Sequence, residues 1–377
     1  MIRDVSIENY KSISELSLEL GQVNLLIGAN GSGKSNILEA IIFGSAAAAE
    51  KFDNEFLANR GIRISNPGIL YCGFDKANRE REIALEFSSE DGNRYKVCLT
   101  GLDGEFYGWE PLSLADIFES EGLDMESLRR ILEVKQQPRI GRKEILKLLQ
   151  PSSGSARRFL SQFLTYTPEI STLRQLHIES YIQPLGLHGE GLFRLLHSLD
   201  KEGQLDEVNE ALTAIDWFDG LKLAGNGAPT ERTIRIVDQY LDPEIATLDQ
   251  RSVNEGFLFF LFHVTLLISR HTPPFFAIEN VDESLNPKLC VHLIQTIARL
   301  SERHEKQVIL TTHNPATLDG LDLSDDEQRL FVVFRNADGH TRVRRILASD
   351  IAAPEGTTPR LSEAFIRGYI GGLPTNF

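Results

Sequence analysis

Apolar and polar positions divide the chain into two α/β regions with a largely helical middle. Ile2–Ile7 and Leu16–Leu20 alternate apolar and polar residues, which predicts two half-buried strands. Val23–Ile27 is a short apolar strand that runs into a glycine-rich turn, and a helix is expected from Lys34 to about Ile42. The chain is therefore predicted to begin with β structure and continue as a strand–turn–helix unit.

Short strands joined by turn residues follow this unit. Glu82–Phe87, Tyr95–Thr100 and Phe106–Trp109 have strand character, and the residues between them contain Asp91-Gly92 and Asp103-Gly104. Asp-Gly steps between apolar runs are typical of hairpins. We therefore expect an antiparallel β segment that ends near residue 112.

The remainder is predicted to be mostly helical from Ser113 to about Asp249, after which the α/β pattern returns. The later elements are expected at Gly256–Ser269, Phe275–Glu279, Pro287–His304, Gln307–Thr311 and Arg329–Arg335. The sequence thus predicts an α/β fold with a mixed sheet. Its units are a first lobe at 1–112, a helical insertion at 113–250 and a second lobe at 251–377. No internal repeat and no long heptad array interrupt this order.

Composition and charge narrow the class of protein. The 377 residues are 41% hydrophobic, which argues against wholesale disorder, and no apolar run reaches the roughly 18 residues of a membrane span. The start has no signal-peptide pattern, and Cys72, Cys98 and Cys290 are scattered without a CxxC pair, so a cytoplasmic setting is expected.

The net charge of −15 would repel nucleic acid if it were spread evenly. Between Arg129 and Arg158, however, nine basic residues face only two glutamates. This stretch is a candidate surface for nucleic acid or for an acidic partner. A solvated helical face explains the same pattern, and the sequence leaves the choice open.

The clearest chemical motif is Gly28-Ala29-Asn30-Gly31-Ser32-Gly33-Lys34-Ser35. It matches G-x-x-x-x-G-K-[ST] and sits between a predicted strand and a predicted helix, as a phosphate-binding loop requires. Backbone N–H groups and the helix N-terminus would surround the phosphates, Lys34 would reach the β- and γ-phosphates, and Ser35 would bind Mg²⁺. The candidate nucleotide ligands are Asn30, Gly31, Ser32, Gly33, Lys34, Ser35 and Asn36.

Three further patterns lie in the second lobe. Phe275–Ile278 is an apolar strand that ends at the acid Glu279, which is the Walker B pattern. His313 follows the strand Gln307–Thr311, where a histidine can donate to a γ-phosphate. Ser252–Gly256 opens the helix before the Walker B strand. A plain helix N-cap is the alternative explanation of this third pattern.

Together these motifs resemble the ATPase heads of the SMC, RecF and OLD group, a branch of the ABC class. The opening Ile7–Ile13 with the loop after it is similar to that group, and so is the stretch from Asn254 to Pro315. More narrowly, the chain resembles stand-alone AAA-type ATPases of bacterial anti-phage systems, such as the ATPase subunit of Septu. Asn254–Phe257, Leu361–Glu363 and Gly371–Pro374 carry that narrower resemblance.

The resemblance assigns roles to single residues. Glu279 would hold Mg²⁺ through water, and Asn254 and Gly256 would face the γ-phosphate of the other subunit's ATP. Aligned on Ser284–Pro287, Asn280 takes the place of the usual catalytic glutamate. An amide cannot accept a proton from water, so hydrolysis would be slow, or Asp282 or Glu283 would substitute.

Two weaker assignments complete the candidate site. Gln183 would be the glutamine that joins Mg²⁺ to the helical insertion, and Lys11 would touch phosphate or base. For Lys11, an ordinary surface lysine remains an equal alternative.

The resemblance implies an ATP·Mg²⁺-dependent enzyme that forms a head-to-tail dimer or higher oligomer. It would act as the sensor or switch subunit of a defence complex. We find no nuclease pattern and no long coiled coil, so the effector is expected to be a separate polypeptide. The alternatives are a scaffold locked by ATP without turnover and a RecF-like DNA-repair ATPase.

Overall fold

The computed structural model describes most of both lobes. The described residues are 1–51, 54–62, 70–75, 78, 81–99, 154–178, 184–224, 232–242, 247–351 and 359–372. The predicted strand Phe106–Trp109, the candidate Gln183 and the basic residues from Arg129 to Lys147 lie outside them.

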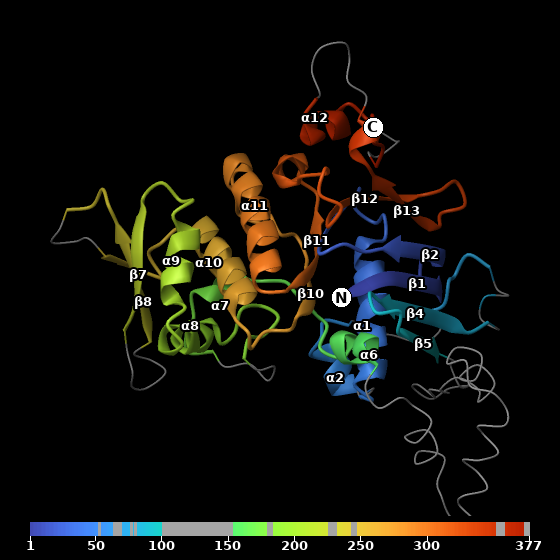
Figure 1. Cartoon of the computed structure of the whole chain (residues 1–377), viewed down its shortest axis with the longest axis horizontal. Coiled ribbons are helices and arrows are strands. Elements are labelled where there is room, and N and C mark those ends of the chain that lie inside the picture. Colours follow the sequence, from blue (N-terminus) through green and yellow to red (C-terminus); the bar gives the residue numbers. More distant parts are fainter. Residues whose placement is uncertain are drawn as a thin grey trace, which may run out of the picture.

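A six-stranded sheet forms the centre of the molecule (Figure 1). Five strands run parallel, and the edge strand β13 is antiparallel to β12, so the mixed sheet predicted from the sequence is confirmed. All five residues of β3 are buried, as expected for a strand covered on both faces. The strands lie in the order β13 (Thr341–Ile346), β12 (Gln328–Arg335), β3 (Val23–Ile27), β11 (Gln307–Thr312), β10 (Phe275–Ile278) and β6 (Leu164–Tyr166).

The predicted antiparallel β segment forms a second sheet near one end of the molecule. Its strands lie in the order β2 (Ile13–Glu19), β1 (Ile2–Tyr10), β4 (Ile83–Ser89) and β5 (Arg94–Leu99). In β4 buried and half-buried residues alternate strictly, so one face of this sheet joins the core. Helix α1 (Lys34–Ala48) shares that core with side chains of both sheets, which fixes α1 between them.

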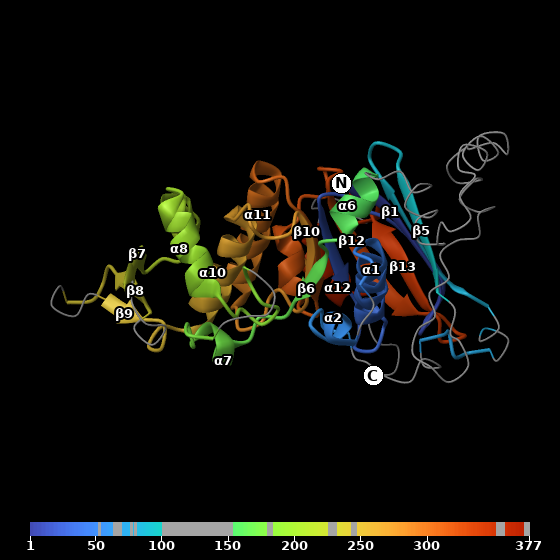
Figure 2. The same ribbon diagram turned by 90° about the horizontal axis from the view of Figure 1, so that it is seen from below.

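Helices cover the other face of the central sheet. In α10 (Glu255–Ile268) every residue after Glu255 is buried, because α10 packs against α11 (Pro287–Arg303) and three shorter helices. Figures 1 and 2 show these helices between the central sheet and a small outer sheet. The shorter helices are α7 (Ile170–Leu173), α8 (Leu192–Lys201) and α9 (Leu205–Leu212), and the outer strands are β7 (Phe218–Ala224), β8 (Thr233–Asp238) and β9 (Thr247–Asp249).

Short helices complete the two ends of the molecule. Helices α2 (Asn54–Ala58) and α6 (Ser155–Leu160) pack on α1, and α12 (Leu361–Ile366) packs on the 3₁₀ helix η4 (Pro315–Gly320). A second 3₁₀ helix, η5, spans Ala348–Asp350. Within the described ranges, no helix combines the length and the apolar character needed to cross a bilayer.

The prediction of a mostly helical stretch from 113 to 250 is correct for α6 to α9 and wrong for β6 to β9. β6 has only three residues, and β7 includes Asp219-Gly220, so neither shows a clear strand pattern. β13 was also missed, because three arginines occupy this edge strand and only Val343 and Ile346 are apolar. Edge strands tolerate such charge, and their pattern is correspondingly weak.

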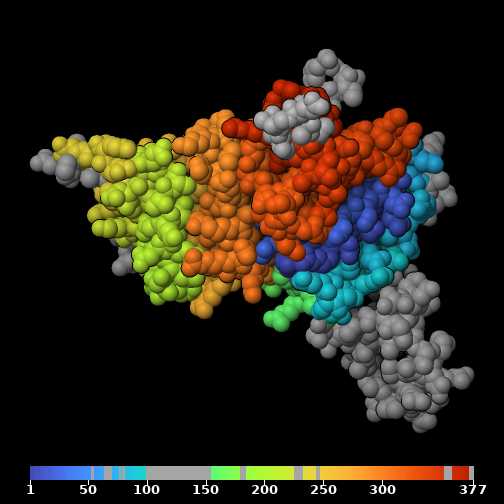
Figure 3. All heavy atoms as spheres, turned by 45° about the horizontal axis from the view of Figure 1, so that its top comes forward, coloured from blue at the N-terminus to red at the C-terminus, as the bar shows by residue number. Residues whose placement is uncertain are grey.

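Chain segments distant in sequence meet on one surface. Figure 3 shows the N-terminal residues between the C-terminal strands and the β4–β5 hairpin. The fully buried side chain of Gln307, at the start of β11, links β1 to the central sheet. Its amide nitrogen donates to the carbonyl oxygens of Ile2 at 2.7 Å and Gly21 at 2.8 Å, and its amide oxygen accepts from the Ile2 N–H at 3.0 Å. One side chain thus satisfies three buried backbone groups.

We predict that Gln307→Leu lowers the free energy of unfolding by about 3 kcal/mol, because buried backbone groups lose their partner. Urea unfolding measures this change. The matched control Gln295→Leu lies on the exposed side of α11 and should change stability by less than about 0.5 kcal/mol. Equal effects of the two substitutions would show that the Gln307 contacts do not hold the two sheets together.

Candidate functional site

The glycine-rich loop leaves β3 at the carboxyl edge of the central sheet. Strand register aligns Ile27 with Thr312 on one side and with Val332 on the other. Residues that follow the neighbouring strands, including Glu279 after β10 and His313 after β11, therefore lie along the same edge. Ligands of open α/β sheets bind at this edge.

Two positions in the loop require glycine for steric reasons. A Cβ at Gly28 would lie 2.1 Å from the Val333 carbonyl oxygen, and a Cβ at Gly33 would lie 2.1 Å from Thr341 Oγ1. Gly33 also has a φ of 110°, in the region that favours glycine. Gly31 has a φ of 75° but no neighbour within 4 Å of a Cβ, so conformation alone favours glycine there.

The side chain of Lys34 is buried against the loop, and the residue is 6% exposed. Its ammonium donates to the carbonyl oxygens of Gly28 at 2.7 Å and Ala29 at 3.2 Å and lies 3.4 Å from His313 Nδ1. Burial lowers the pKa of Lys34 to about 8, against the opposing effect of the Glu279 carboxylate. An anion placed here would compensate for the lost hydration of the ammonium.

A hydrogen-bonded group of three side chains, Thr341, Ser12 and Asn36, contacts the glycine-rich loop. Thr341 Oγ1 donates to the Ser32 carbonyl oxygen at 2.8 Å and lies 2.7 Å from Ser12 Oγ. The Asn36 amide donates to the same Ser12 hydroxyl at 2.6 Å. The predicted ligand Asn36 is thus placed beside the loop and bonded to protein through this amide.

The hydroxyls of the loop fit a phosphate and a metal ion. Ser32 Oγ is buried and has no hydrogen-bond partner in the described part of the chain, and Ser35 is exposed at the start of α1. An orphaned buried hydroxyl is unfavourable unless a ligand satisfies it. Ser35 and Glu279 supply oxygen atoms, which Mg²⁺ prefers. Asn30 and Gly31 are also exposed.

The segment after β10 holds the candidate catalytic groups. Asn280 has a φ of 49°, a left-handed conformation in which asparagine is favoured, and its N–H donates to Thr311 Oγ1 at 3.1 Å. Asp282 accepts from Thr312 Oγ1 at 2.6 Å, and burial raises the pKa of this carboxyl. Glu283 is exposed. The three candidates for the catalytic base thus differ in their surroundings: Asn280 lies in a left-handed turn, Asp282 is hydrogen-bonded and partly buried, and Glu283 faces solvent.

His313 lies beside Lys34 at the end of β11. Burial, and then the positive charge of Lys34, lower the pKa of His313 from its ordinary value, which favours the neutral imidazole. A neutral imidazole has one ring nitrogen as donor and the other as acceptor. This state suits a hydrogen bond to a phosphate oxygen.

The start of α10 contacts the turn that follows the Walker B strand. A Cβ at Gly256 would lie 3.1 Å from the Ser284 carbonyl oxygen, and Ser284 Oγ donates to Glu255 at 3.3 Å. Asn254 Oδ1 accepts from the Phe257 N–H at 2.9 Å. The N-cap expected as an alternative role of Asn254 is therefore present.

The weaker candidates are placed as follows. Lys11 has a φ of 47° and forms an ion pair with Glu39 of α1, so its charge is already compensated within the protein. Arg157, from the end of the basic stretch, pairs with Glu50 at 2.6 Å. Among the described residues, no group of three His, Cys, Asp or Glu side chains forms a further metal site.

Sequence reasoning missed Thr341 and Arg335. Arg335 Nε donates to the Gly31 carbonyl oxygen at 2.9 Å from the end of β12. Both residues lie about 300 positions from the loop in sequence, and only the pairing of β12 with β3 and β13 brings them there. The place of Arg335 at the end of a predicted strand was an available signal for that residue.

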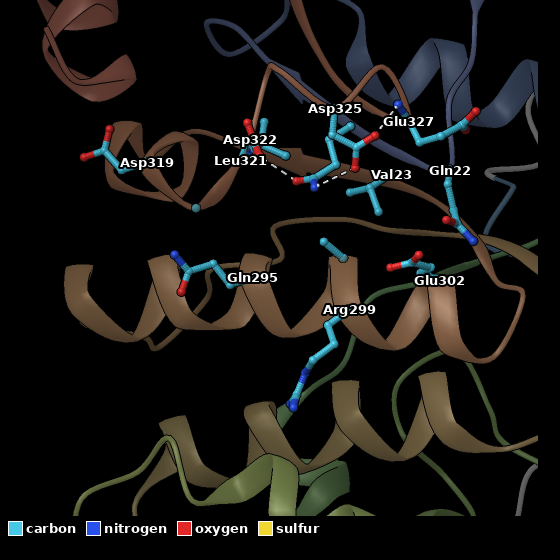
Figure 4. Close-up of a pocket in the computed structure, with 13 residues that line it drawn as sticks. Gln22, Val23, Gln295, Arg299, Glu302, Asp319, Leu321, Asp322, Asp325 and Glu327 are labelled. Atoms are coloured by element: carbon cyan, nitrogen blue, oxygen red, sulfur yellow. Dashed lines mark hydrogen bonds between the residues drawn. The ribbon is translucent and has the colours of Figure 1, made fainter. Parts of the chain in front are cut away.

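A cavity of about 420 Å³ lies at the opposite edge of the central sheet, between the start of β3 and α11 (Figure 4). Its carboxylates are partly engaged by protein groups: Asp319 accepts from the Ser362 hydroxyl at 2.6 Å, and Asp325 accepts from Gln328 at 3.0 Å. None of the loop residues lines this cavity. The cavity and the candidate nucleotide site therefore lie at opposite edges of the central sheet.

The chain is similar to several known proteins. Residues 23–319 match the family model described as "AAA domain, putative AbiEii toxin, Type IV TA system". The chain is 37% identical over 98 residues to the uncharacterized protein MJECL10 of Methanocaldococcus jannaschii, covering 24% of this chain and 43% of that protein. It is 32% identical over 100 residues to the DNA replication and repair protein RecF of Mannheimia succiniciproducens, covering 26% and 27%. The chain spans less than half the length of these relatives.

Among solved structures, the SMC head domain from Thermotoga maritima is similar, with a TM-score of 0.42 and 14% sequence identity. The match covers 92% of this chain and 98% of that one.

We predict that Gly33→Ala lowers the free energy of unfolding by about 3 kcal/mol, because it adds a clash with Thr341 to the strain of a positive φ. Gly31→Ala is the matched control and adds only the strain, about 1 kcal/mol. Urea unfolding compares the two variants. Equal losses would contradict the bracing role of Thr341.

Proposed function

Because the chain belongs to the AAA-domain family that its residues 23–319 match, we propose that it binds ATP·Mg²⁺ at Gly28–Ser35 and uses the nucleotide as a switch. The observation that carries this proposal is the position of Lys34. A buried ammonium whose hydrogen-bond partners in the described part of the chain are two carbonyl oxygens and an imidazole is a site for a polyanion, because the more distant Glu279 carboxylate does not offset its desolvation. The N-terminus of α1 adds a partial positive charge at the same place.

The roles proposed for the other residues combine the sequence motifs with the positions of those residues that the structure describes. Ser35 and Glu279 would hold Mg²⁺, with Gln183 proposed as a further ligand, and the bound ion would neutralise charge on the phosphates. His313 would donate to the γ-phosphate in its neutral form. Asn30, Gly31, Ser32 and Gly33 would offer backbone N–H groups to the phosphates.

Hydrolysis is proposed to be slow and to depend on Asp282 rather than Asn280. The amide of Asn280 cannot take a proton from water. Asp282 can, and the raised pKa that burial gives this carboxyl makes its ionised form a stronger base. The hydrogen bond from Thr312 lowers the same pKa, which favours the ionised carboxylate.

A head-to-tail dimer is proposed as the closed state. The exposed Asn254 and the small Gly256 stand at the N-terminus of α10, where the helix dipole favours an anion. The partner subunit's γ-phosphate would supply that anion. Contact between Gly256 and Ser284 would connect this interface to the turn that carries Asp282.

We propose that the closed dimer signals to a separate effector polypeptide through the region 113–250, as the sensor subunit of a bacterial defence complex. The matched family description itself mentions a toxin of a type IV system. A ligand that binds only the closed state shifts the equilibrium by its differential affinity. ATP would supply that difference.

Two other functions have specific support. Asn280 favours a scaffold that holds ATP without turnover. The similarity to RecF and the basic stretch from Arg129 to Arg158 favour a DNA-repair ATPase. A DNA affinity that falls steeply with salt concentration would distinguish the DNA-repair alternative from the others.

Single-turnover hydrolysis at high enzyme concentration, with size-exclusion chromatography in parallel, tests the switch. We expect ATP·Mg²⁺ to shift the protein to a larger assembly that relaxes after hydrolysis. Asp282→Asn should slow hydrolysis roughly 100-fold or more while the assembly persists, because the general base is removed. Glu283→Gln is the control on an exposed carboxylate and should stay near the unmodified rate.

Two outcomes would contradict parts of this proposal. ATP that survives for hours in a persistent dimer of the unmodified protein would identify the scaffold. Unchanged hydrolysis in Asp282→Asn would remove Asp282 as the base.

A further inference from the structure

An exposed phenylalanine lies beside the phosphate loop. Phe74 is 49% exposed, which few large apolar side chains in the described part of the chain are. Its segment runs next to the end of β1, where Tyr71 bridges to Tyr10 and the Cys72 N–H donates to the Asn9 carbonyl oxygen at 3.2 Å. Phe74 therefore belongs to the surface that surrounds the start of α1 and not to a distant loop.

The ring is supported from one side by the turn between β12 and β13. His340 meets Phe74 edge to face, with ring centroids 4.8 Å apart and planes at 69°. A Cβ at Gly339 would lie 3.0 Å from Phe74 Cε1, so backbone approaches the ring closely. Hydrogen bonds from Asn336 N–H to His340 and from Gly339 N–H to Asn336 close this turn. The Phe74 ring thus packs against a hydrogen-bonded turn, while about half of the residue's surface stays exposed.

Arg335 connects this ring to the loop. Its Nε donates to the Gly31 carbonyl oxygen at 2.9 Å and its Nη1 to the Gly339 carbonyl oxygen at 2.5 Å. The guanidinium carbon lies 5.8 Å from the centre of the Phe74 ring. A single side chain therefore contacts both the phosphate loop and the aromatic surface, which places the two within the reach of one ligand.

We propose that Phe74 is the stacking platform for the base of the bound nucleotide, with Arg335 fixing the distance from platform to loop. This proposal rests on the proposed nucleotide function. Stacking of a base on a half-exposed aromatic side chain beside a phosphate site is favourable, because it removes apolar ring surface from water. Because every base has such a face, the platform adds affinity for a nucleoside triphosphate over inorganic triphosphate without selecting one base.

Calorimetric titration with Mg²⁺ and either ATP or inorganic tripolyphosphate tests the platform. Phe74→Ala should weaken ATP binding roughly 5- to 100-fold and leave tripolyphosphate binding unchanged, because only the base contact is lost. Phe74→Trp should retain ATP affinity, since it preserves the aromatic face. Tyr240→Ala is the control: Tyr240 is 76% exposed but follows β8, at the other end of the molecule (Figure 1).

Several results would overturn the platform. Unchanged ATP affinity in Phe74→Ala would do so, and so would an equal loss for tripolyphosphate, which would mean that Phe74 acts through the shape of the loop. If the unmodified protein bound neither probe, the nucleotide function itself would fail. ATP binding that is independent of Phe74 would remove only the platform.

Discussion

The buried ammonium of Lys34 is the constraint on which the site depends. A lysine at the end of a parallel sheet loses much of its hydration, and here, among the described residues, the carbonyl oxygens of Gly28 and Ala29 and the imidazole of His313 take the place of the water. The glycines let the loop close over this charge, and Thr341 fixes the loop from behind. The lowered pKa of Lys34 reflects the unfavourable desolvation of its ammonium, and a bound polyanion would raise this pKa again.

Local patterns predicted the part of the site that lies on contiguous sequence. The strand–loop–helix unit, the strand ending at Glu279 and the position of His313 all follow from short motifs, and the structure brings them to one edge of the sheet. Thr341, Arg335 and Phe74 could not be predicted, because strand pairing across about 300 residues of sequence brings them to the loop. The strands β7 and β9 were missed for a different reason, because Asp219-Gly220 interrupts β7 and β9 has only three residues. In β8 the residues Thr233 to Ile236 do alternate polar and apolar, and this signal was overlooked.

Backbone conformation adds a second reason for the residue at position 280. The positive φ of Asn280 favours asparagine over glutamate, so the missing catalytic carboxylate coincides with a turn that suits an amide. Two residues later, Asp282 is partly buried and hydrogen-bonded to Thr312. If Asp282 is the catalytic carboxylate, its access to water would depend on how the proposed dimer closes.

The most direct test of the account is the proton balance of ATP·Mg²⁺ binding, measured by calorimetry in two buffers of different ionisation enthalpy. The pKa of Lys34 is about 8 in the free protein, and phosphate would raise it. Binding should therefore take up almost no proton at pH 7 and close to one proton at pH 9, with weaker affinity at the higher pH. Binding at pH 9 without proton uptake would contradict the claim that a desolvated Lys34 ammonium is the centre of the site.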